Sequence, residues 1–365
     1  MSGALVHEWL SKRGGSENVL VELSRIFPDA AISALWDDAP DRFAAGRVTE
    51  TWLAKTPLRN HKALAVPFMP ATWRNLGRSD AEWILCSSHL FAHHARFKGS
   101  AREAPKYVYT HTPARYIWTP ELDVRGSGAV ARAVSRPLQE LDRRRAQEAH
   151  SIASNSAFVA RRVQQAWGRE SVVIHPPVSV QDFVDDSSNR LTGEEEALLT
   201  SLPETFILGA SRFVPYKRLD VAIAAGVASG IQVVIAGEGP DEPRLRDIAD
   251  NSPGVVTFVP KPSFALLNQL YRRALVFVFP AIEDFGIMPV EAMAAGTPVI
   301  ANAVGGAAES VQHGKTGAVL HSFDTSSLLE AVDIAAAANR EACTARAWEF
   351  DVSEFDANIR AWVGV

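Results

Sequence analysis

The sequence has little cysteine and no long hydrophobic run. Its 365 residues include two cysteines, Cys86 and Cys343, and no Cys-x-x-Cys pair, so a zinc site or a disulfide is not expected. No uncharged stretch reaches the roughly 18 apolar residues that a membrane-spanning helix requires. Residues 1–10 lack the apolar core of a signal peptide. These absences predict a cytoplasmic protein that contacts membranes only through its surface.

Neither sign of charge dominates, and no acidic metal motif is present. Lysine and arginine number 37 against 42 aspartates and glutamates, and the net charge of −5 predicts no nucleic-acid partner. The chain has no Asp-x-Asp motif placed to carry a metal ion, so any anionic ligand would have to be neutralised by basic side chains and helix N-termini. The length predicts two domains, at about 150 residues each.

The second half of the chain shows the clearest organisation. Short β-rich runs alternate with helical patterns, which predicts a doubly wound parallel α/β sheet. The predicted strands are 206–209, 233–236, 255–259, 276–279 and 299–301, and the helices are 218–228, 242–251, 264–274 and 289–295. In the first half, strands are expected at 4–6, 83–86 and 107–109 and a helix at 137–150. Pro176 and Pro177 place the domain boundary at 177.

The most specific motif spans residues 283–291, Glu-Asp-Phe-Gly-Ile-Met-Pro-Val-Glu. It follows a predicted strand, and Pro289 suits the first turn of the next helix. Glu283 would lie at the carboxyl end of the strand and Glu291 about one turn into the helix, whose free N–H groups suit a diphosphate. The two carboxylates would accept hydrogen bonds from sugar and ribose hydroxyls. The alternative is that both only stabilise the helix dipole.

A second loop places two cations after the predicted strand 206–209. Arg212 and Lys217 flank the sequence Phe-Val-Pro-Tyr. An arginine fork and a lysine point charge suit a diphosphate leaving group, on which negative charge develops as the glycosidic bond breaks. The alternative is a solvated basic loop.

Several further positions are weaker candidates. Gly237 opens a tight Gly-Glu-Gly-Pro turn, and Gly15 lies in a glycine loop that opens a helix. His111 follows a predicted strand and could donate a hydrogen bond to a sugar, although a lone histidine is often structural. The adjacent His93 and His94 would point in different directions from a helix, so no metal site is expected there.

In this order, the motifs resemble the retaining glycosyltransferase family 4 over nearly the whole chain. The segments that carry the resemblance are 14–17, 212–217, 237–240 and 283–291, with Gly305, Gly306 and Glu309. The family implies the GT-B fold, in which two Rossmann-like, doubly wound α/β domains face each other across a cleft and a C-terminal helix crosses back to the first domain. The expected domains are 1–177 for the acceptor, 178–347 for the nucleotide sugar and 348–365 for that helix.

The resemblance also implies roles and a mechanism. The implied catalytic residues are His111, Arg212, Lys217 and Glu283, and the implied donor-binding residues are Gly15, Gly237, Phe285, Gly286, Ile287 and Glu291. The expected reaction retains the anomeric configuration by front-side displacement and needs no metal or other cofactor. Residues 111–118 and 212–220 look most like those of bacterial O-antigen and exopolysaccharide mannosyltransferases, although Arg218 stands where many relatives carry glycine. GDP-mannose is therefore the expected donor, a UDP-hexose the alternative, and the acceptor a glycan or a lipid-linked sugar.

Two other classes of function remain open. One is a different enzyme on the same fold, such as a sugar-nucleotide epimerase or a phosphorylase, and the other is a non-catalytic protein that only binds a sugar nucleotide.

Residues 52–78 predict a contact with a membrane surface. Between Lys55 and Arg78 every charged residue is basic, and aromatic and apolar residues are interleaved. Such a composition suits an anionic lipid surface, so peripheral attachment to the inner face of the plasma membrane is expected. The alternative is a helical hairpin with its apolar side in the core.

Overall fold

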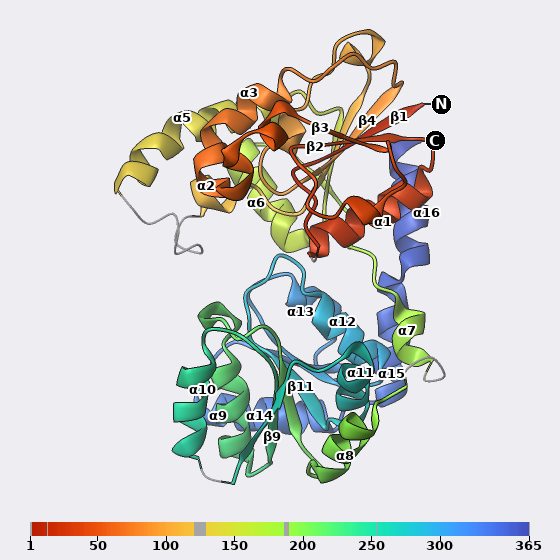
Figure 1. Cartoon of the computed structure of the whole chain (residues 1–365). Coiled ribbons are helices and arrows are strands. Elements are labelled where there is room, and N and C mark those ends of the chain that lie inside the picture. Colours follow the sequence, from red (N-terminus) through yellow and green to blue (C-terminus); the bar gives the residue numbers. More distant parts are fainter. Residues whose placement is uncertain (1, 13, 120–128, 186–189, 253, 365) are drawn as a thin grey trace. The chain divides into compact units, whose positions relative to one another are not determined.

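Residues 2–12, 14–119, 129–185, 190–252 and 254–364 are described by the computed structural model. The chain divides into two compact units, one of Met1–Pro177 with Phe355–Val365 and the other of Val178–Glu354. Each unit contains a parallel sheet with helices packed on it, as Figure 1 shows. The two Rossmann-like α/β domains confirm the predicted fold class.

The N-terminal unit is built on a seven-stranded sheet in the order β3-β2-β1-β4-β5-β6-β7, in which the strand pairs are parallel. The strands are β1 Gly3–His7, β2 Ala31–Ala34, β3 Val48–Glu50, β4 Trp83–Ser88, β5 Lys106–Thr110, β6 Ser151–Ser154 and β7 Val172–Val173. Its α-helices are α1 Gly15–Ile26, α2 Lys62–Ala65, α3 Met69–Trp73, α4 Arg115–Trp118, α5 Ala129–Ala146 and α6 Ala157–Trp167. Short 3₁₀ turns are η1 Pro40–Arg42, η2 Trp52–Lys55, η3 Pro57–Asn60, η4 Val66–Phe68, η5 Ala92–His94 and η6 Ser100–Arg102.

The C-terminal unit is built on a six-stranded parallel sheet in the order β10-β9-β8-β11-β12-β13. The strands are β8 Ile207–Ala210, β9 Val233–Gly237, β10 Val256–Pro260, β11 Val276–Phe279, β12 Val299–Asn302 and β13 Gly317–Leu320. Its helices are α7 Val180–Val184, α8 Gly193–Ser201, η9 Pro215–Lys217, α9 Leu219–Ser229, α10 Glu242–Asp250, α11 Phe264–Arg273, α12 Ile287–Ala294, α13 Ala307–Ser310, α14 Thr325–Ala336, α15 Arg340–Ala347 and η10 Trp348–Phe350.

Both faces of each sheet are covered, which explains the continuous apolar runs. Successive side chains of a strand point to opposite faces. In β1, Ala4 and Val6 belong to one hydrophobic cluster, whereas Leu5 belongs to the cluster on the other face. A sheet buried on both faces is typical of parallel α/β folds, and it leaves the loops at the strand ends as the places where polar side chains gather.

The C-terminal helix α16, Val352–Val363, packs in the N-terminal unit through its residues from Phe355 onward. The ring of Phe355 lies 5.7 Å from that of Tyr109, and the indole Nε1 of Trp362 donates to Ser151 Oγ at 2.7 Å. Arg360 donates to the carbonyl of Ile26 at 3.2 Å. The last helix thus anchors the chain end to strands β5 and β6 and to helix α1.

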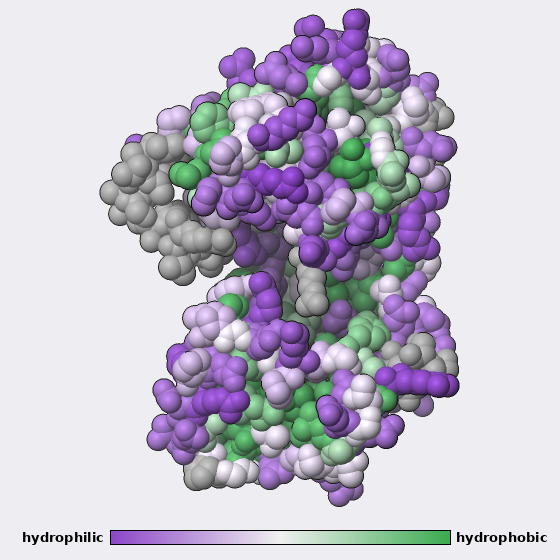
Figure 2. Space-filling view, in the orientation of Figure 1, coloured by the Kyte–Doolittle hydropathy of each residue, from purple (hydrophilic) through white to green (hydrophobic). Residues whose placement is uncertain are grey.

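Some local expectations differ from the structure. The helix predicted from residue 137 begins earlier, and Pro137 lies inside α5 instead of in its first turn. Both cysteines are buried and free, as expected. Within the described ranges, none of the helices combines the length and the hydropathy that a membrane span needs. Figure 2 shows mainly hydrophilic residues on the face that it presents, with smaller hydrophobic areas between them.

Candidate functional site

The C-terminal sheet reverses its strand order between β8 and β11. From β8 the chain continues outward through β9 and β10, and from β11 it continues in the other direction through β12 and β13. Loops that leave two such strands diverge to opposite faces of the sheet, and the gap between them is where open α/β sheets bind ligands. The loop after β8 carries Arg212 and Lys217, and the loop after β11 carries Glu283.

Lys217 and Glu283 form an ion pair across this point. Lys217 Nζ lies 2.6 Å from Glu283 Oε1, and the side chains are only 12% and 20% exposed. The ammonium group also lies 5.4 Å from the centre of the Phe279 ring at the end of β11. Two predicted site residues are therefore brought together, each holding the other in a partly buried position that retains contact with solvent.

Arg212 is arranged differently. Its side chain is exposed, and its guanidinium contacts the hydroxyl of Tyr216 at 3.4 Å. The structure thus places Arg212 on the same loop as Lys217 but outside the ion pair, where its remaining N–H donors are available for an anion.

Two glycine turns allow the site loops to approach one another closely. A Cβ atom on Gly237 would come within 1.9 Å of the carbonyl oxygen of Ser211, and one on Gly306 within 2.1 Å of that of Asp284. The Gly306 N–H donates to the carbonyl of Glu283 at 2.8 Å. The turns after β9 and β12 therefore pack directly against the backbone of the loops that carry the charged residues.

The segment after Glu283 leads into the N-terminus of α12. Gly286 caps this helix with a φ of 90°, a conformation that favours glycine, and Phe285 is buried beneath it. The N–H groups of the first turn, which begins at Ile287, have no partner within the helix and can donate hydrogen bonds to an anion. Phe285, Gly286 and Ile287 are thus placed beside Glu283, as the predicted sugar contact requires.

Glu291 lies in the second turn of α12 and has an unusual acidity. Burial raises the pKa of Glu291 to about 7, although the hydroxyl of Tyr271, 3.5 Å from Oε2, opposes the shift. This carboxyl is therefore protonated more readily than an ordinary glutamate. It can donate as well as accept a hydrogen bond, which suits a contact with a ribose hydroxyl.

The N-terminal sheet has its own reversal of strand order, between β1 and β4. Glu8 follows β1 and His89 follows β4, and Glu8 Oε2 lies 3.2 Å from His89 Nδ1. The other oxygen of Glu8 accepts the backbone N–H groups of His89, Leu90 and Ala92 at 2.8–3.1 Å. Burial opposes ionisation, but His89, His7 and these N–H groups outweigh it and lower the pKa of Glu8. No local sequence pattern indicates this pair, because its members are 81 residues apart.

His111 lies beside the same edge of the N-terminal sheet. Its Nε2 is 2.8 Å from Ser87 Oγ, and its ring centre is 6.4 Å from those of His7 and His89. Burial, together with the positive charges that His89 and His7 can carry, holds the pKa of His111 well below its usual range. A neutral imidazole at this place can donate or accept one hydrogen bond, in keeping with the predicted contact to a sugar.

Gly15 is exposed at the first residue of α1. The loop before it already holds a carboxylate, because Glu17 accepts hydrogen bonds from Ser11 N at 3.2 Å and from Ser16 Oγ at 2.8 Å. A Cβ on Gly14 would lie 2.0 Å from Glu17 Oε2, so a larger residue there would displace this carboxylate. The start of α1 is therefore stabilised by its own acidic side chain.

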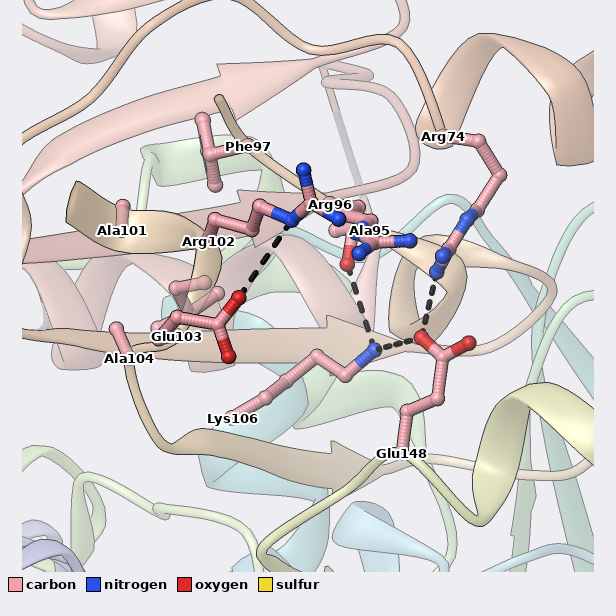
Figure 3. A pocket seen from close by; sticks show the side chains of 11 residues that line it. Arg74, Ala95, Arg96, Phe97, Ala101, Arg102, Glu103, Ala104, Lys106 and Glu148 are labelled. Carbon is pink, nitrogen blue, oxygen red and sulfur yellow. Dashed lines mark hydrogen bonds and ion pairs between the residues drawn. The ribbon is translucent and has the colours of Figure 1, made fainter. Parts of the chain in front are cut away.

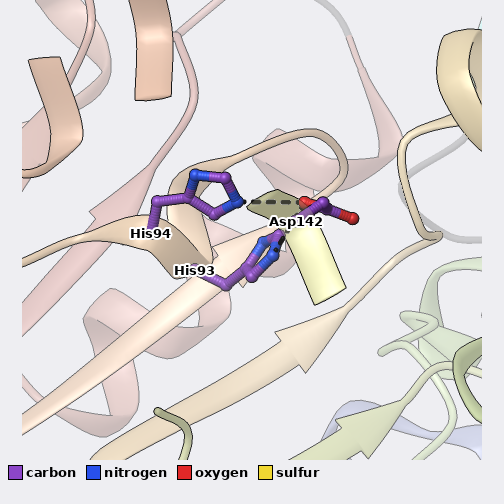
Figure 4. Close-up of side chains that lie close together, drawn as sticks. All are labelled: His93, His94 and Asp142. Carbon is purple, nitrogen blue, oxygen red and sulfur yellow. Dashed lines mark hydrogen bonds and ion pairs between the residues drawn. The ribbon is translucent and has the colours of Figure 1, made fainter. Parts of the chain in front are cut away.

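The adjacent histidines form a buried cluster with an aspartate, shown in Figure 4. The Nε2 atoms of His93 and His94 lie 3.1 and 3.0 Å from the same oxygen of Asp142. The indole N–H groups of Trp118 and Trp167 donate to its other oxygen at 2.7 Å. The expectation that the two rings diverge was wrong, because η5 is a 3₁₀ turn and not an α-helix. Two indole N–H donors and two imidazole nitrogens around one buried carboxylate indicate a structural polar centre.

Comparison with known families identifies the domain that contains these loops. Residues 194–347 match the family described as "Glycosyl transferases group 1". This matched region of the C-terminal unit, which resembles that family, is referred to as the group 1 domain. The match includes Arg212, Lys217, Gly237 and the 283–291 motif, so all the predicted site residues of the C-terminal unit lie within the group 1 domain.

Related sequences carry similar names. The chain is 31% identical over 200 residues to the D-inositol 3-phosphate glycosyltransferases of Mycobacterium bovis and Mycobacterium tuberculosis. The alignment covers 51% of this chain, and the chain spans only 41% of the length of those relatives.

Solved structures extend the likeness in fold to the whole chain. Anabaena Alr3699/HepE in complex with UDP has a TM-score of 0.72 at 19% identity and is covered over 99% of both chains. Sucrose-phosphate synthase of Thermosynechococcus elongatus has a TM-score of 0.70 at 17% identity, over 100% of this chain and 98% of that one. These matches confirm the GT-B fold class.

Proposed function

We propose that this protein is a glycosyltransferase that moves a hexose from a nucleotide diphosphate sugar to a glycan or lipid-linked acceptor. The Lys217–Glu283 ion pair at the strand-order reversal of the group 1 domain carries the proposal. It places a cation and a carboxylate side by side at the ligand-binding edge of the sheet. The cation suits the anionic diphosphate, and the carboxylate suits the sugar, whose hydroxyl groups are hydrogen-bond donors. The bond that must break joins these two parts of the donor.

The mechanism follows from the charges at this edge. The bond between the anomeric carbon and the phosphate oxygen breaks, and the electron pair stays with the diphosphate. Lys217 and Arg212 stabilise that charge together with the N-terminus of α12. Glu283 and the N–H groups of the following residues orient the sugar, and Glu291 contacts the ribose. The acceptor oxygen forms the new bond on the same face, and its proton passes to the leaving phosphate oxygen, so the configuration is retained.

The proposed donor is a nucleotide diphosphate hexose. GDP-mannose is the first candidate, because residues 111–118 and 212–220 resemble those of bacterial mannosyltransferases. The UDP-hexose alternative is supported by Anabaena Alr3699/HepE, which has been solved with UDP and with UDP-glucose. A thermal-shift screen with GDP, UDP and ADP sugars separates these candidates, because a ligand that binds only the native state raises the melting temperature. A shift with the guanosine series alone supports GDP-mannose, and a shift with the uridine series alone replaces it. No shift with any nucleotide would refute the donor site.

A non-catalytic sugar-nucleotide binder is the second candidate. It is favoured by the exposure of Arg212, which no carboxylate holds in place in the described part of the chain. Transfer assays across acceptor sugars decide between the two functions. A protein that only binds the sugar nucleotide is stabilised by it against heat but transfers no sugar to an acceptor.

A membrane contact through residues 52–78 is part of the proposal. Trp52, Leu64 and Phe68 are 52%, 62% and 47% exposed, and the rings of Trp52 and Phe68 lie 6.4 Å apart, edge to face. Lys55 and Lys62 are exposed near them in sequence. This apolar and basic set suits the headgroup region of an anionic bilayer, where a lipid-linked acceptor would be found.

A further inference from the structure

A cavity of about 320 Å³ lies at the amino-terminal edge of the N-terminal sheet, shown in Figure 3. Lys106, the first residue of β5, lines it, whereas His111 follows the opposite end of the same strand. The cavity is therefore separate from the polar cluster that contains Glu8, His89 and His111. Its charged lining residues are Arg74, Arg96, Arg102, Glu103, Lys106 and Glu148.

One acidic residue of the lining, Glu148, already forms ion pairs with three cations. Glu148 pairs with Arg74 at 2.5 Å, Arg145 at 2.8 Å and Lys106 at 3.3 Å. Burial opposes its ionisation, but these cations lower the pKa of Glu148 to about 2. The carboxylate of Glu148 is thus fully committed to existing partners. Glu103 lies at the rim, where its side chain is 86% exposed and 3.5 Å from Arg102.

Positive charge in the cavity is left uncompensated. Four basic and two acidic side chains line it, which is a formal excess of two positive charges. Arg96 is only partly exposed, and no carboxylate among the described residues lies within salt-bridge distance of its guanidinium. Figure 3 draws Arg74 and Lys106 joined to Glu148, but Arg96 without a partner. Burial lowers the pKa of Arg74, and the neighbouring Arg145 and Arg96 lower it further, as expected for like charges held together.

The positive charge of Lys106 is also disfavoured by burial. It is almost fully buried, and its Nζ donates to the carbonyl of His93 at 2.8 Å and to that of Ala95 at 3.3 Å. Burial lowers the pKa of Lys106 despite its contact with Glu148. An anion in the cavity would therefore stabilise three cations at once, Arg74, Arg96 and Lys106.

We propose that this cavity is a binding site for a phosphate group, separate from the proposed donor site and not part of the transfer reaction. A phosphate monoester carries a charge of about −1.5 to −2 at neutral pH, which matches the excess charge of the lining. The planar guanidinium of Arg96 offers paired N–H donors for the phosphate oxygens. Arg102 can exchange its contact with the exposed Glu103 carboxylate for a contact with the phosphate. The volume lies at the lower end of the range for small-molecule sites, which suits inorganic phosphate or a small phosphorylated metabolite.

The test is calorimetric titration of the whole protein with inorganic phosphate at constant ionic strength. The titration uses the Lys217→Ala variant as well as the wild type, because the proposed donor site could also bind phosphate. We expect a dissociation constant on the order of 1 mM in both proteins. Replacing Arg96 with glutamine should weaken binding by at least about tenfold, since it removes the unpaired guanidinium. The matched control is Arg161→Gln, an exposed arginine of α6 outside the cavity, which should leave the affinity unchanged.

A second variant and a second ligand complete the experiment. Arg96→Lys keeps the charge and should retain part of the affinity, which shows that a loss in Arg96→Gln is not a loss of fold. Glucose 6-phosphate bound at least about tenfold more tightly than inorganic phosphate would identify a phosphorylated metabolite, and equal affinity would identify the free ion. The proposal is overturned if wild-type protein binds no phosphate, if Arg96→Gln binds it as well as wild type, or if Lys217→Ala alone abolishes binding. Failure of the proposed transferase function would leave the result unaffected, since the assay requires no nucleotide.

Discussion

At the residue scale, Lys217 and Glu283 depend on each other at the proposed donor site. The 2.6 Å contact holds the ammonium group where a diphosphate would bind and the carboxylate where a sugar would bind. Both side chains keep contact with solvent, so the loss of either partner should appear in ligand binding and turnover more than in stability.

We expect Glu283→Gln to lower turnover by about a hundredfold or more while the melting temperature changes little, because a site that has lost a group acting in the transition state typically loses this much rate. Lys217→Ala should weaken nucleotide diphosphate binding by about tenfold or more, since it removes a charge-assisted contact. Glu194→Gln, an exposed residue of α8, is the control. Near-normal transfer by a well-folded Glu283→Gln enzyme would exclude the sugar contact.

The lowered pKa of Glu8 leads to a prediction about how the stability of the fold depends on pH. Its pKa is lowered in the folded protein relative to the ordinary value of 4.5, so its ionised form contributes stability at pH values above 4.5. That contribution is lost as the pH falls through the lower, folded-state pKa. We expect Glu8→Gln to be less stable than wild type at pH 7 by about 1–3 kcal/mol, because a neutral amide oxygen replaces a charged acceptor of three backbone N–H groups, and the difference to shrink below pH 4.5.

Melting temperatures of wild type and Glu8→Gln, measured side by side from neutral to acid pH, test this expectation. Only the difference between the two proteins is interpreted, because Glu148 and Asp142 also have lowered pKa values and contribute equally to both. A difference that stays constant with pH would show that ionisation of Glu8 does not stabilise the fold.

At the element scale, the glycine turns after β9 and β12 decide how closely the site loops approach. Gly306 has an ordinary φ of −74°, so substitution by alanine adds no backbone strain. Its new Cβ would instead lie 2.1 Å from the carbonyl oxygen of Asp284 and push the Glu283 loop away.

We expect Gly306→Ala to weaken nucleotide-sugar binding and to cost about 1–3 kcal/mol of stability, as overpacked sites do. Gly193→Ala is the matched control, because its Cβ would meet open space. Calorimetry and thermal melting of the two variants provide the comparison. Equal donor affinity in both would mean that the turn does not position the loop.

The segment 52–78 is also best considered as a set of elements. It forms η2, η3, α2, η4 and α3 in place of one amphipathic helix, because its prolines interrupt the pattern. Its apolar residues divide between core and surface: Leu53, Met69 and Trp73 are buried, whereas Trp52 and Phe68 are exposed. Of its cations, Arg59 pairs with Asp38 and Arg74 with Glu148, so fewer charges remain for lipid than the sequence suggested.

We expect the protein to co-sediment with vesicles that contain anionic lipid at low salt and to be released at high salt, since each basic residue near such a surface contributes roughly 1 kcal/mol. Replacing Trp52 and Phe68 with serine should reduce sedimentation, and replacing the exposed Leu329 of α14 should not. Negligible pelleting under all conditions would assign the segment to packing alone.

At the scale of the whole molecule, the proposed reaction depends on cationic side chains and not on a bound metal. Arg212, Lys217 and the start of α12 lie on loops at one edge of the C-terminal sheet, where they can meet the charge of a leaving diphosphate.

We therefore expect transfer to continue in excess EDTA at a rate within about twofold of the untreated enzyme, because charge compensation of this kind needs no ion from solution. Nucleotide release in the presence and absence of EDTA is the measurement. A rate that collapses with chelator and returns with Mg²⁺ or Mn²⁺ would replace this mechanism by a metal-dependent one.

The sequence by itself determined the fold class and much of the group 1 domain. The strands predicted at 206–209 and 233–236 correspond closely to β8 and β9, because alternation of apolar runs and helical patterns is a local property. The 283–291 motif was recognisable for the same reason, because it lies in a local pattern of strand, loop and helix start. The exact start of α5 could not be predicted, since a proline usually marks the first turn of a helix and Pro137 instead lies inside this one.

Only the tertiary structure decided which distant side chains meet. Strand order brings Lys217 to Glu283 across 66 residues, and Glu8 to the loop of His89 across 81. The same is true of Asp142 with His93 and His94, and of the cations that surround the cavity at the start of β5. A parallel sheet places the ends of strands far apart in the chain at one edge, where His89, His7 and backbone N–H groups lower the pKa of Glu8. Burial in the packed C-terminal unit raises the pKa of Glu291. Local spacing contains neither the strand order nor the burial, so these contacts could not be derived from it.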